Sequence, residues 1–509
     1  MRYIISYDLG TGGTKASLFD EQGTSCAHTF VSCDTFYPRE NFREQRPEDW
    51  WESVKVSTKL LLEKTGIDPE CIQALAVSGH SLGAVPMGMD GSLLAEYVPV
   101  WNDARAGLEA EEFFRSVDEN TWYETTGNGF PAPLYAVFKI MWYKKNQQEL
   151  YEKTKVFIGT KDYVNYKLTG VLCTDASYAS GSGVYSLEKS GYVEEYIEAS
   201  GISGEKFPDI YPSTHIIGTV LPEAAEELGL WPGTQVACGG VDNACMALGA
   251  ACFMDGDVYT SLGTSAWIAV SSGKPIVNRE TRPYVFAHCI PGKYVSSVAI
   301  FSAGNSFRWV RNTLCPDYVK MEKDGKCDAY DRMTEEAEGA PLGANRLIFN
   351  PSLAGGTSLD KSQNIRGLYA GLDLRHTRAD MIRASMEGIS MNLRLVMDSL
   401  ERELPLSEDM LLVGGGGKSR FWREIFAAVY EKNMIETNVG EDAGSLGAAA
   451  VAAVGCGMWK DFEIVKELHR TVSVAKPDRE MADGYRRLLP VFRKISQMAS
   501  DMGDMLSEL

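Results

Sequence analysis

Residues 7–19 read YDLGTGGTKASLF, and this stretch indicates what kind of domain the chain begins with. A strand-like run ends at Asp8, a glycine-rich turn follows, and the apolar pattern resumes at Ala16, which predicts two strands joined by a tight turn. Glycines in such a turn let successive backbone N–H groups point at one phosphate. Asp8 is placed to hold hydrated Mg²⁺, and Lys15 to supply a positive charge. A plain hairpin without a ligand is the alternative.

A weaker copy of this pattern lies in the second half of the chain. Residues 260–270 read TSLGTSAWIAV and again predict strand, Leu-Gly-Thr turn and strand. We therefore expect two similar domains, joined near residues 244–256, each contributing such a turn to a shared cleft. Strand-like runs alternate with helical patterns such as residues 49–63 and 379–401, which predicts an α/β fold.

Two further turns are suited to chemistry. A strand-like run at residues 411–413 leads into four glycines from Gly414, then Lys418 and a helical pattern. A glycine backbone leaves space for a base or a ribose, and the N-terminus of the following helix favours an anion. A glycine run that stands alone is more often a plain loop. Asp242 follows a strand in GGVDNA (239–244), where a carboxylate can act as general base on one hydroxyl while Asn243 holds another. A helix N-cap is the alternative role for Asp242.

The segments SGHSLG (78–83) and WNDAR (101–105) combine planar hydrogen-bonding groups with an aromatic face, a combination that binds sugars. A structural histidine is the alternative for His80. The sequence has no Ser/His/Asp order and no pair of histidines at metal-ligand spacing, so nucleophilic hydrolysis and zinc chemistry have no support.

The composition excludes several classes of protein. The 509 residues, 44% hydrophobic and 23% charged, are typical of a globular chain with more than one domain. A net charge of -19 disfavours nucleic acid and anionic membranes as partners. The 11 cysteines form no CxxC or Cys/His cluster and the N-terminus lacks signal-peptide features, so we expect reduced thiols and a cytoplasmic location. The apolar run at residues 444–459 is short and glycine-rich, which predicts a buried helix and no membrane span.

Together and in order, the motifs resemble the FGGY family of carbohydrate kinases, and most closely its xylulokinase branch. The most specific match is GLYAGLDLRHTRADMIRASMEG from Gly367, which is similar to the family's second signature, whereas the first signature, around Lys139 and Trp142, is degenerate. The other matching segments, in chain order, are DLGTGGTK (from Asp8), REQRPEDWW (Arg43), VSGHSLGA (Val77), WNDAR (Trp101), KDYVNYKLTG (Lys161), TDAS (Thr174), GGVDNA (Gly239), SLGTSA (Ser261) and GGGGKS (Gly414).

The resemblance implies two ribonuclease-H-like domains of the actin and Hsp70 type, residues 1–246 mainly for sugar and 247–509 mainly for nucleotide, with a nucleotide and sugar cleft between them. It implies ATP-dependent phosphorylation of a sugar hydroxyl, most closely that of D-xylulose to D-xylulose 5-phosphate, with ATP and Mg²⁺ as cofactors; a homodimer is a further expectation. The residues implied are Asp8 for the metal; Asp242 as the catalytic base; Thr11, Lys15, Gly263, Thr264, Gly414, Gly415 and Lys418 for ATP; and His80, Ser81, Leu82, Asp103, Asp242 and Asn243 for the sugar.

One segment departs from the branch. Where xylulokinases usually have QMHG, the chain has His80, Ser81, Leu82 and Gly83, so another ketose, a polyol or an aldonate, such as ribulose or gluconate, stays open as the substrate. An ATPase of the actin or Hsp70 type that acts on no sugar shares the first turn but does not explain GGVDNA, WNDAR or the second signature. A sugar sensor with degenerate chemistry is disfavoured by the presence of both Asp8 and Asp242.

Overall fold

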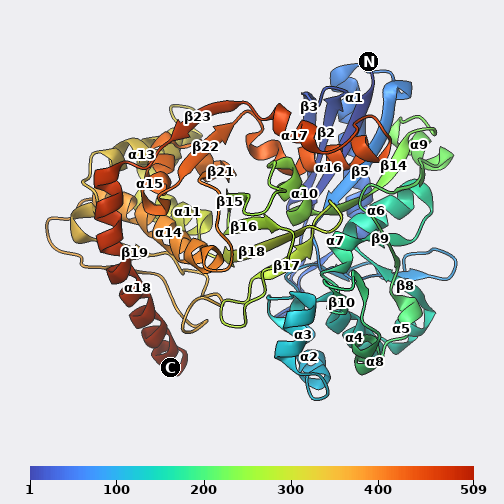
Figure 1. Cartoon of the computed structure of the whole chain (residues 1–509), viewed down its shortest axis with the longest axis horizontal. Coiled ribbons are helices and arrows are strands. Elements are labelled where there is room, and N and C mark those ends of the chain that lie inside the picture. Colours follow the sequence, from blue (N-terminus) through green and yellow to red (C-terminus); the bar gives the residue numbers. More distant parts are fainter. The chain divides into compact units, whose positions relative to one another are not determined.

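The computed structural model describes all residues from Met1 to Leu509, and they form two compact units (Figure 1). The first unit contains Met1–Asp255, Ser271–Ser296 and Asp442–His469, and the second contains Gly256–Val270, Ser297–Glu441 and Arg470–Leu509. The division into domains at residue 246 stays a prediction. The compact units interleave along the chain, since residues 442–469 belong to the first.

The first unit is built on a six-stranded sheet. The strand order is β13-β14-β5-β1-β2-β3, with β1 antiparallel to β2 and parallel to β5, and β5 parallel to β14. The predicted hairpin is confirmed, because β1 and β2 are joined through Thr11 and Gly12 and pair Asp8 with Lys15. The bounds of these strands are β1 Tyr3–Gly10, β2 Gly13–Asp20, β3 Ser25–Ser32, β5 Ile72–Gly79, β13 Ile216–Thr219 and β14 Gln235–Val241.

A second sheet of seven strands has the order β17-β18-β16-β15-β21-β22-β23. Its β15–β16 hairpin, its parallel strands β21 and β22 and its antiparallel last strand β23 repeat the arrangement of the first sheet. The internal similarity predicted from the two Leu-Gly-Thr turns is therefore confirmed. The bounds are β15 Val258–Leu262, β16 Ala266–Ser272, β17 Tyr284–Ala287, β18 Tyr294–Ile300, β21 Asp409–Val413, β22 Asn433–Thr437 and β23 Thr471–Ala475.

Short strands complete the β-structure in pairs outside these sheets. They are β4 Glu44–Gln45, β6 Val85–Gly88, β7 Val98–Pro99, β8 Thr154–Ile158, β9 Cys173–Asp175, β10 Tyr185–Ser186, β11 Gly191–Tyr192, β12 Asp209–Tyr211, β19 Ile348–Asn350 and β20 Leu368–Ala370.

The two predicted long helices are confirmed as α1 and α14. Helix α1 begins at Pro47, which suits a first helical turn, and ends at Thr65, followed by the capping residue Gly66, whose φ of 64° is left-handed. A capping box between Thr377 and Asp380 starts α14. The helices are α1 Pro47–Thr65, α2 Gly107–Phe113, α3 Glu119–Thr126, α4 Ala136–Asn146, α5 Gln148–Lys153, α6 Thr160–Thr169, α7 Ala176–Ala179, α8 Glu194–Ser200, α9 Pro222–Leu228, α10 Asp242–Gly249, α11 Gly304–Leu314, α12 Pro316–Lys323, α13 Ala329–Glu338, α14 Arg378–Glu401, α15 Arg420–Tyr430, α16 Ala443–Gly455, α17 Glu463–Leu468 and α18 Arg479–Ser507.

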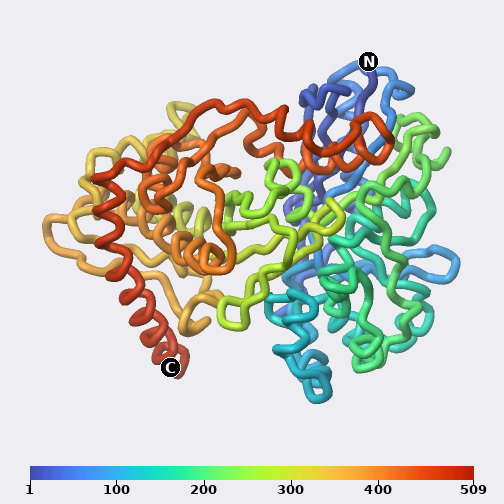
Figure 2. The backbone as a smooth tube through the Cα atoms, in the orientation of Figure 1, coloured from blue at the N-terminus to red at the C-terminus, as the bar shows by residue number.

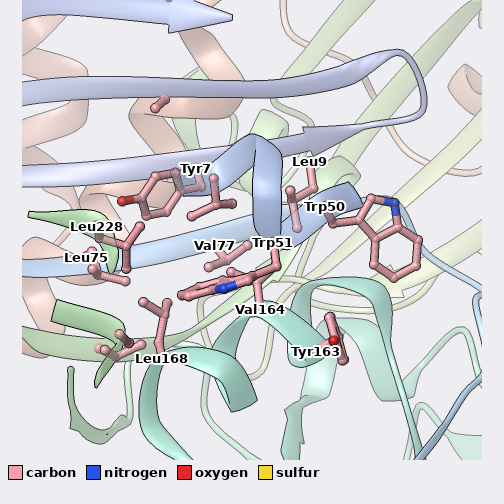
Figure 3. Packing of buried hydrophobic residues seen from close by; sticks show 14 of the residues in the cluster. Tyr7, Leu9, Trp50, Trp51, Leu75, Val77, Tyr163, Val164, Leu168 and Leu228 are labelled. Carbon is pink, nitrogen blue, oxygen red and sulfur yellow. The ribbon is translucent and has the colours of Figure 1, made fainter. Parts of the chain in front are cut away.

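The main core of the first unit lies between its sheet and helices α1 and α6. Alternate residues of the central strands, such as Tyr7 of β1 and Val77 of β5, pack against Trp51 of α1 and Leu168 of α6 (Figure 3). Burial of this apolar surface is the main favourable contribution to folding. The core therefore fixes the strands whose carboxyl ends carry the predicted site residues.

The apolar run at residues 444–459 forms α16, which is buried from Ala443 to Ala453. Helix α16 packs on α10 and on strands β1 and β5, so this late segment lies beside the earliest strands (Figure 2). Gly249 permits the contact, because a Cβ there would come within 1.7 Å of the Ala443 carbonyl oxygen. The predicted buried helix is confirmed, and none of the helices has both the length and the apolar character that a membrane span needs.

Candidate active site

Three predicted site residues lie at one edge of the first sheet. Strands β1, β5 and β14 are parallel neighbours, so their carboxyl ends meet at the same edge. Asp8 lies near the end of β1, His80 follows β5, and Asp242 follows β14. Ligands of α/β proteins commonly bind at such an edge. The structure therefore brings together the predicted metal carboxylate, a predicted sugar residue and the predicted base.

Asp242 is the first residue of α10, and its carboxylate is oriented by the next residue. Asn243 donates to Asp242 Oδ1 from its backbone N–H at 2.8 Å and from its side-chain amide at 3.1 Å. Both bonds reach the same oxygen, which leaves Oδ2 for a substrate hydroxyl. Removal from water and then the nearby charge of Asp8 raise the pKa of Asp242 to about 7. Such a pKa suits a general base near neutral pH.

We expect activity to depend on the protonation of Asp242. Because its pKa is raised to about 7, the carboxyl is protonated below that pH and becomes a base only above it. The value of kcat/KM for the sugar should therefore fall by about tenfold per pH unit below pH ~7 and level off above it. A pH–rate profile of the wild type checks this, and the residual activity of Asp242→Asn should lack the acidic limb. A wild-type profile that stays flat to pH ~5 would contradict the assignment.

A buried polar network holds the end of β14. The Ser177 hydroxyl accepts a hydrogen bond from the Val241 N–H at 2.8 Å and donates one to Asp175 Oδ2 at 2.5 Å. Lys161 Nζ lies 3.1 Å from Asp175 Oδ1 and donates to the Cys238 carbonyl at 3.1 Å. A fully satisfied buried network specifies one geometry. The segments KDYVNYKLTG and TDAS, to which the sequence assigned no role, thus position the residue before the predicted base.

The predicted phosphate contacts of the first turn already have protein partners. Thr11 Oγ1 accepts a hydrogen bond from Trp101 Nε1 at 2.9 Å, and the Thr11 carbonyl accepts one from Gln45 Nε2 at 2.7 Å. Lys15 forms an ion pair with Asp442, which lies directly before α16. These contacts fix the turn, and a phosphate would have to share or replace the partner of Lys15. The ATP roles of Thr11 and Lys15 stay predictions.

Asp8 has the surroundings that a magnesium ligand needs. Burial raises its pKa, while the Ser78 hydroxyl and the charge of Lys15 lower it. A Cβ at Gly444 would lie 3.3 Å from Asp8 Oδ2, so glycine there leaves space beside the carboxylate. The chain offers no cage of three or more His, Cys, Asp or Glu, and Mg²⁺ commonly takes one or two carboxylates together with waters and substrate phosphates. The residues therefore fit a Mg²⁺ ion that arrives with ATP.

His80 has the unpaired polar atoms of a ligand-binding side chain. It is 2% exposed and packs edge-to-face on Trp50, and neither ring nitrogen has a hydrogen-bond partner. Burial and the charge of Lys139 lower its pKa to about 4, so the ring is neutral at pH 7 and offers one donor and one acceptor. Asn102 Oδ1 is likewise buried without a partner. Sequence reasoning placed Asn102 in the predicted sugar-binding turn WNDAR but did not single it out as a site residue.

Lys139 connects two loops of the predicted sugar motifs, one at Leu82 and one at Val100. Leu82 has a left-handed φ of 62° and its side chain is fully buried in a hydrophobic cluster. Lys139 Nζ donates to the Leu82 carbonyl at 2.8 Å and to the Val100 carbonyl at 2.7 Å. Burial lowers the pKa of Lys139 to about 7, although the charge of Asp103 raises it. Ser81 is also buried, so the sugar roles of Ser81 and Leu82 stay predictions.

Asp103, a predicted sugar ligand, is fully buried and fully paired. Its Oδ2 accepts from the Arg43 N–H at 2.6 Å and from the Arg105 guanidinium at 2.8 Å, and its Oδ1 accepts from Arg105 Nε at 2.8 Å. Arg105 also pairs with Glu44 at 2.7 Å. These bonds hold the WNDAR turn against β4. A sugar hydroxyl would compete with them, so the role of Asp103 stays a prediction.

A cavity of about 370 Å³ in the second unit brings together two turns that the sequence predicted separately. Gly263 and Thr264, after β15, line it together with Gly415 and Lys418, after β21. Its volume is in the range of small-molecule sites. Lys418 is exposed, and its Nζ lies 3.2 Å from Glu441 Oε1. The structure thus places four of the predicted ATP residues around one cavity.

Neighbouring glycines hold these turns close to one another. The Gly263 carbonyl accepts a hydrogen bond from the Gly304 N–H at 3.0 Å, and a Cβ on Gly304 would come within 2.2 Å of that oxygen. Gly414 does not line the cavity. Gly414 has a φ of 92°, and its backbone passes close to that of Leu262. A Cβ on Gly414 would lie 2.7 Å from the Leu262 carbonyl oxygen. Helices α11 and α15 begin at this cavity, and helix N-termini attract anions.

Sequence reasoning missed the part of the cavity lining that comes from α11 and α13. Phe307 and Arg308 of α11 and Tyr330 and Asp331 of α13 line the cavity, with the rings of Phe307 and Tyr330 stacked at 5.8 Å. An aromatic wall suits a base, and Asp331 offers acceptors for ribose hydroxyls. The only signal in the sequence was the presence of aromatic and charged residues on two amphipathic helices, which is common on any protein surface.

The comparisons with known proteins identify the family. Residues 3–249 match the N-terminal domain and residues 258–456 the C-terminal domain of the FGGY family of carbohydrate kinases. The chain therefore belongs to the FGGY family of carbohydrate kinases, and the prediction of a sugar kinase is confirmed at this level.

Individual relatives match the chain over nearly its whole length. It is 27% identical to the xylulose kinase of Bacillus subtilis (strain 168) over 510 residues, 99% of both chains. The solved ligand-bound xylulose kinase of Lactobacillus acidophilus is 25% identical with a TM-score of 0.88, over 97% of this chain and 98% of that one. The solved gluconate kinase of the same organism is also 25% identical, with a TM-score of 0.89 over 99% of both chains. The predicted two-domain α/β fold is confirmed by these structures.

Proposed function

We propose that the protein transfers the γ-phosphoryl group of ATP to a hydroxyl of a neutral ketose, with D-xylulose as substrate and D-xylulose 5-phosphate as product. The observation that carries the proposal is the carboxylate of Asp242, one oxygen held by Asn243 and the other unpaired, with a pKa raised to about 7. Asp242 Oδ2 would take the hydroxyl proton as the sugar oxygen bonds to the γ-phosphorus and the bond to the bridging oxygen of ADP breaks.

The nucleotide would occupy the cavity of the second unit. The backbone N–H of Thr264 and the exposed ammonium of Lys418 would meet the phosphates, Gly263 would leave room for them, and the ring of Tyr330 would contact the base. Asp8 would hold Mg²⁺, which when bound neutralises phosphate charge during transfer. The chain's net charge of -19 makes such local neutralisation necessary.

Lys139 and Arg105, the cations beside the predicted sugar loops, already have protein partners, and this supports a neutral substrate. Lys139 donates to backbone carbonyls, and Arg105 pairs with Asp103 and Glu44. An aldonate brings a carboxylate, which is costly to desolvate without a free cation. A ketose or polyol brings hydroxyls alone, which the neutral ring of His80 and the amide of Asn102 can pair. Ribulose and the polyols are therefore closer alternatives than gluconate.

A substrate panel tests this proposal. ADP release should be measured with D-xylulose, D-ribulose, xylitol and D-gluconate in the presence of Mg²⁺. We expect the highest kcat/KM for D-xylulose and a value for gluconate lower by about 10²-fold or more. A preference for gluconate would overturn the choice of substrate while leaving the kinase reaction intact.

We also propose a cytoplasmic location and a homodimer. All 11 cysteines are free, including Cys245 and Cys289, whose sulfur atoms lie 3.9 Å apart without a disulfide bond. Unbridged neighbouring thiols support a reducing compartment.

A further inference from the structure

Lys139 of α4 is a buried cation that is held by backbone carbonyl groups. The residue is fully buried, and its Nζ donates to the Leu82 carbonyl at 2.8 Å, to the Val100 carbonyl at 2.7 Å and to the Trp101 carbonyl at 3.5 Å. An ammonium group has three N–H donors, so these carbonyls can accept all of them. Burial lowers the pKa of Lys139 to about 7, because the charged form is costly away from water. A costly buried charge points to a role in the geometry that it fixes.

The three carbonyls belong to two loops, which we name the His80 loop (residues 80–83) and the Asn102 loop (residues 100–105). Both ring nitrogens of His80 and the Oδ1 atom of Asn102 are buried without a hydrogen-bond partner. Each tethered carbonyl lies within two residues of one of these unpaired groups. The ammonium of Lys139 therefore links the backbone beside one unpaired group to the backbone beside the other.

The conformation of Leu82 in the His80 loop depends on this donor. Leu82 has a φ of 62°, in the left-handed region that residues with a Cβ rarely adopt. The rest of the loop has its own contacts, because Thr160 Oγ1 and Tyr178 Oη form hydrogen bonds with its backbone at 2.7 Å and 3.1 Å. Without Lys139 these two bonds would keep the loop folded, but the buried Leu82 carbonyl would lose its donor.

The Asn102 loop has a second attachment to α4. The guanidinium carbon of Arg105 lies 4.9 Å from the ring centroid of Trp142, and its Nη2 lies 2.8 Å from Asp103 Oδ2. Trp142 follows Lys139 by three residues, so the two side chains leave α4 on the same face. Loss of the ammonium would leave the Arg105 contact in place, and we expect the loop to shift but not to detach.

We infer that Lys139 is a positioning residue for the sugar: it fixes the spacing between His80 and Asn102 and takes no part in phosphoryl transfer. The inference rests on the proposed function. Lys139 does not line the nucleotide cavity, and the bonds that orient Asp242 come from Asn243. A shifted loop would weaken sugar binding before and during transfer to the same extent, which raises the KM for the sugar and leaves kcat unchanged.

The first test compares substitutions of two buried lysines. Lys139→Met keeps the length of the side chain and removes its charge and donors. It should raise the KM for D-xylulose by about tenfold or more, while kcat and the KM for ATP change by less than about threefold. Lys206→Met is the matched control, since Lys206 is also buried in the first unit and donates to a backbone carbonyl, that of Thr154. It should retain wild-type kinetics.

Two kinetic results would overturn the inference. One is a KM for D-xylulose that rises equally in both variants or stays at the wild-type value in Lys139→Met. The other is a fall in kcat of about tenfold or more in Lys139→Met, which would place the lysine in the transfer step. If circular dichroism shows that Lys139→Met does not fold, Lys139→Gln replaces it. That variant keeps an amide donor on a shorter side chain, and its KM should change in the same direction.

The second test needs no substrate. Hydrogen exchange measured by mass spectrometry follows the backbone N–H groups of both loops, among them those of His80 and Asp103, each bonded to a backbone carbonyl at 3.1 Å. Peptides that cover the two loops should exchange about tenfold faster in Lys139→Met and at the wild-type rate in Lys206→Met. A wild type that phosphorylates no sugar of the panel would overturn the proposed function. Loop exchange that is unchanged in Lys139→Met would overturn the positioning role itself.

Discussion

Replacing Asp242 with Asn is expected to lower kcat by about 10²- to 10⁴-fold. The amide has the size of the carboxylate but cannot accept the hydroxyl proton, while the Asn243 contacts to the remaining oxygen are preserved. Because the substitution leaves the shape of the site unchanged, the KM for the sugar and for ATP should change by less than about threefold. Steady-state kinetics with D-xylulose and Mg²⁺-ATP measures both effects.

Asp209→Asn is the matched control, since Asp209 is an exposed carboxylate of the same unit. It should retain wild-type kinetics. If Asp242→Asn keeps more than about a tenth of the wild-type kcat, general-base catalysis belongs to another residue.

The second large effect is expected for Gly263→Val, which should raise the KM for ATP by about tenfold or more. Gly263 lines the nucleotide cavity, and the nearest atom to a Cβ there is the Ser265 carbonyl oxygen at 3.6 Å. The protein therefore has room for the side chain, which would occupy the space proposed for phosphate. The KM for the sugar should be unaffected.

Gly204→Val controls for the substitution itself, because a Cβ at Gly204 meets no atom within 4 Å and the residue lies outside the cavity. Both variants should melt within a few degrees of the wild type. A folded Gly263→Val protein with unchanged ATP affinity would mean that the turn after β15 is a hairpin without a nucleotide role.

The sheets and their end residues were predictable because their signals are local. Glycine-rich turns after short apolar runs marked the hairpins at Asp8 and Gly263. The parallel order of β1, β5 and β14, which places Asp242 at the same edge as Asp8, came from the structure. The alternation of apolar and polar residues along a strand and the presence of glycine at a turn can each be seen within a few consecutive residues.

Other features depend on contacts between distant segments. Nothing in residues 442–469 indicates that they belong to the first unit, since this follows from the packing of α16 on β1 and β5. The hydrogen bonds that Arg105 donates to Asp103 and the position of Tyr330 in the cavity lining likewise depend on tertiary contacts. A sequence names the residue types of a site, but only the fold decides which polar groups are left unpaired.

The most direct test of the account is the fate of the γ-phosphoryl group. Purified protein should be incubated with Mg²⁺-ATP, with and without D-xylulose, and ADP, inorganic phosphate and phosphorylated sugar should be measured together by ³¹P NMR and mass spectrometry. We expect one phosphorylated sugar for each ADP, carrying the phosphate on its primary hydroxyl, and little phosphate release without sugar. ATP consumed into inorganic phosphate with no phosphorylated product, for any sugar of the panel, would contradict the proposed reaction and favour a nucleotide-driven ATPase.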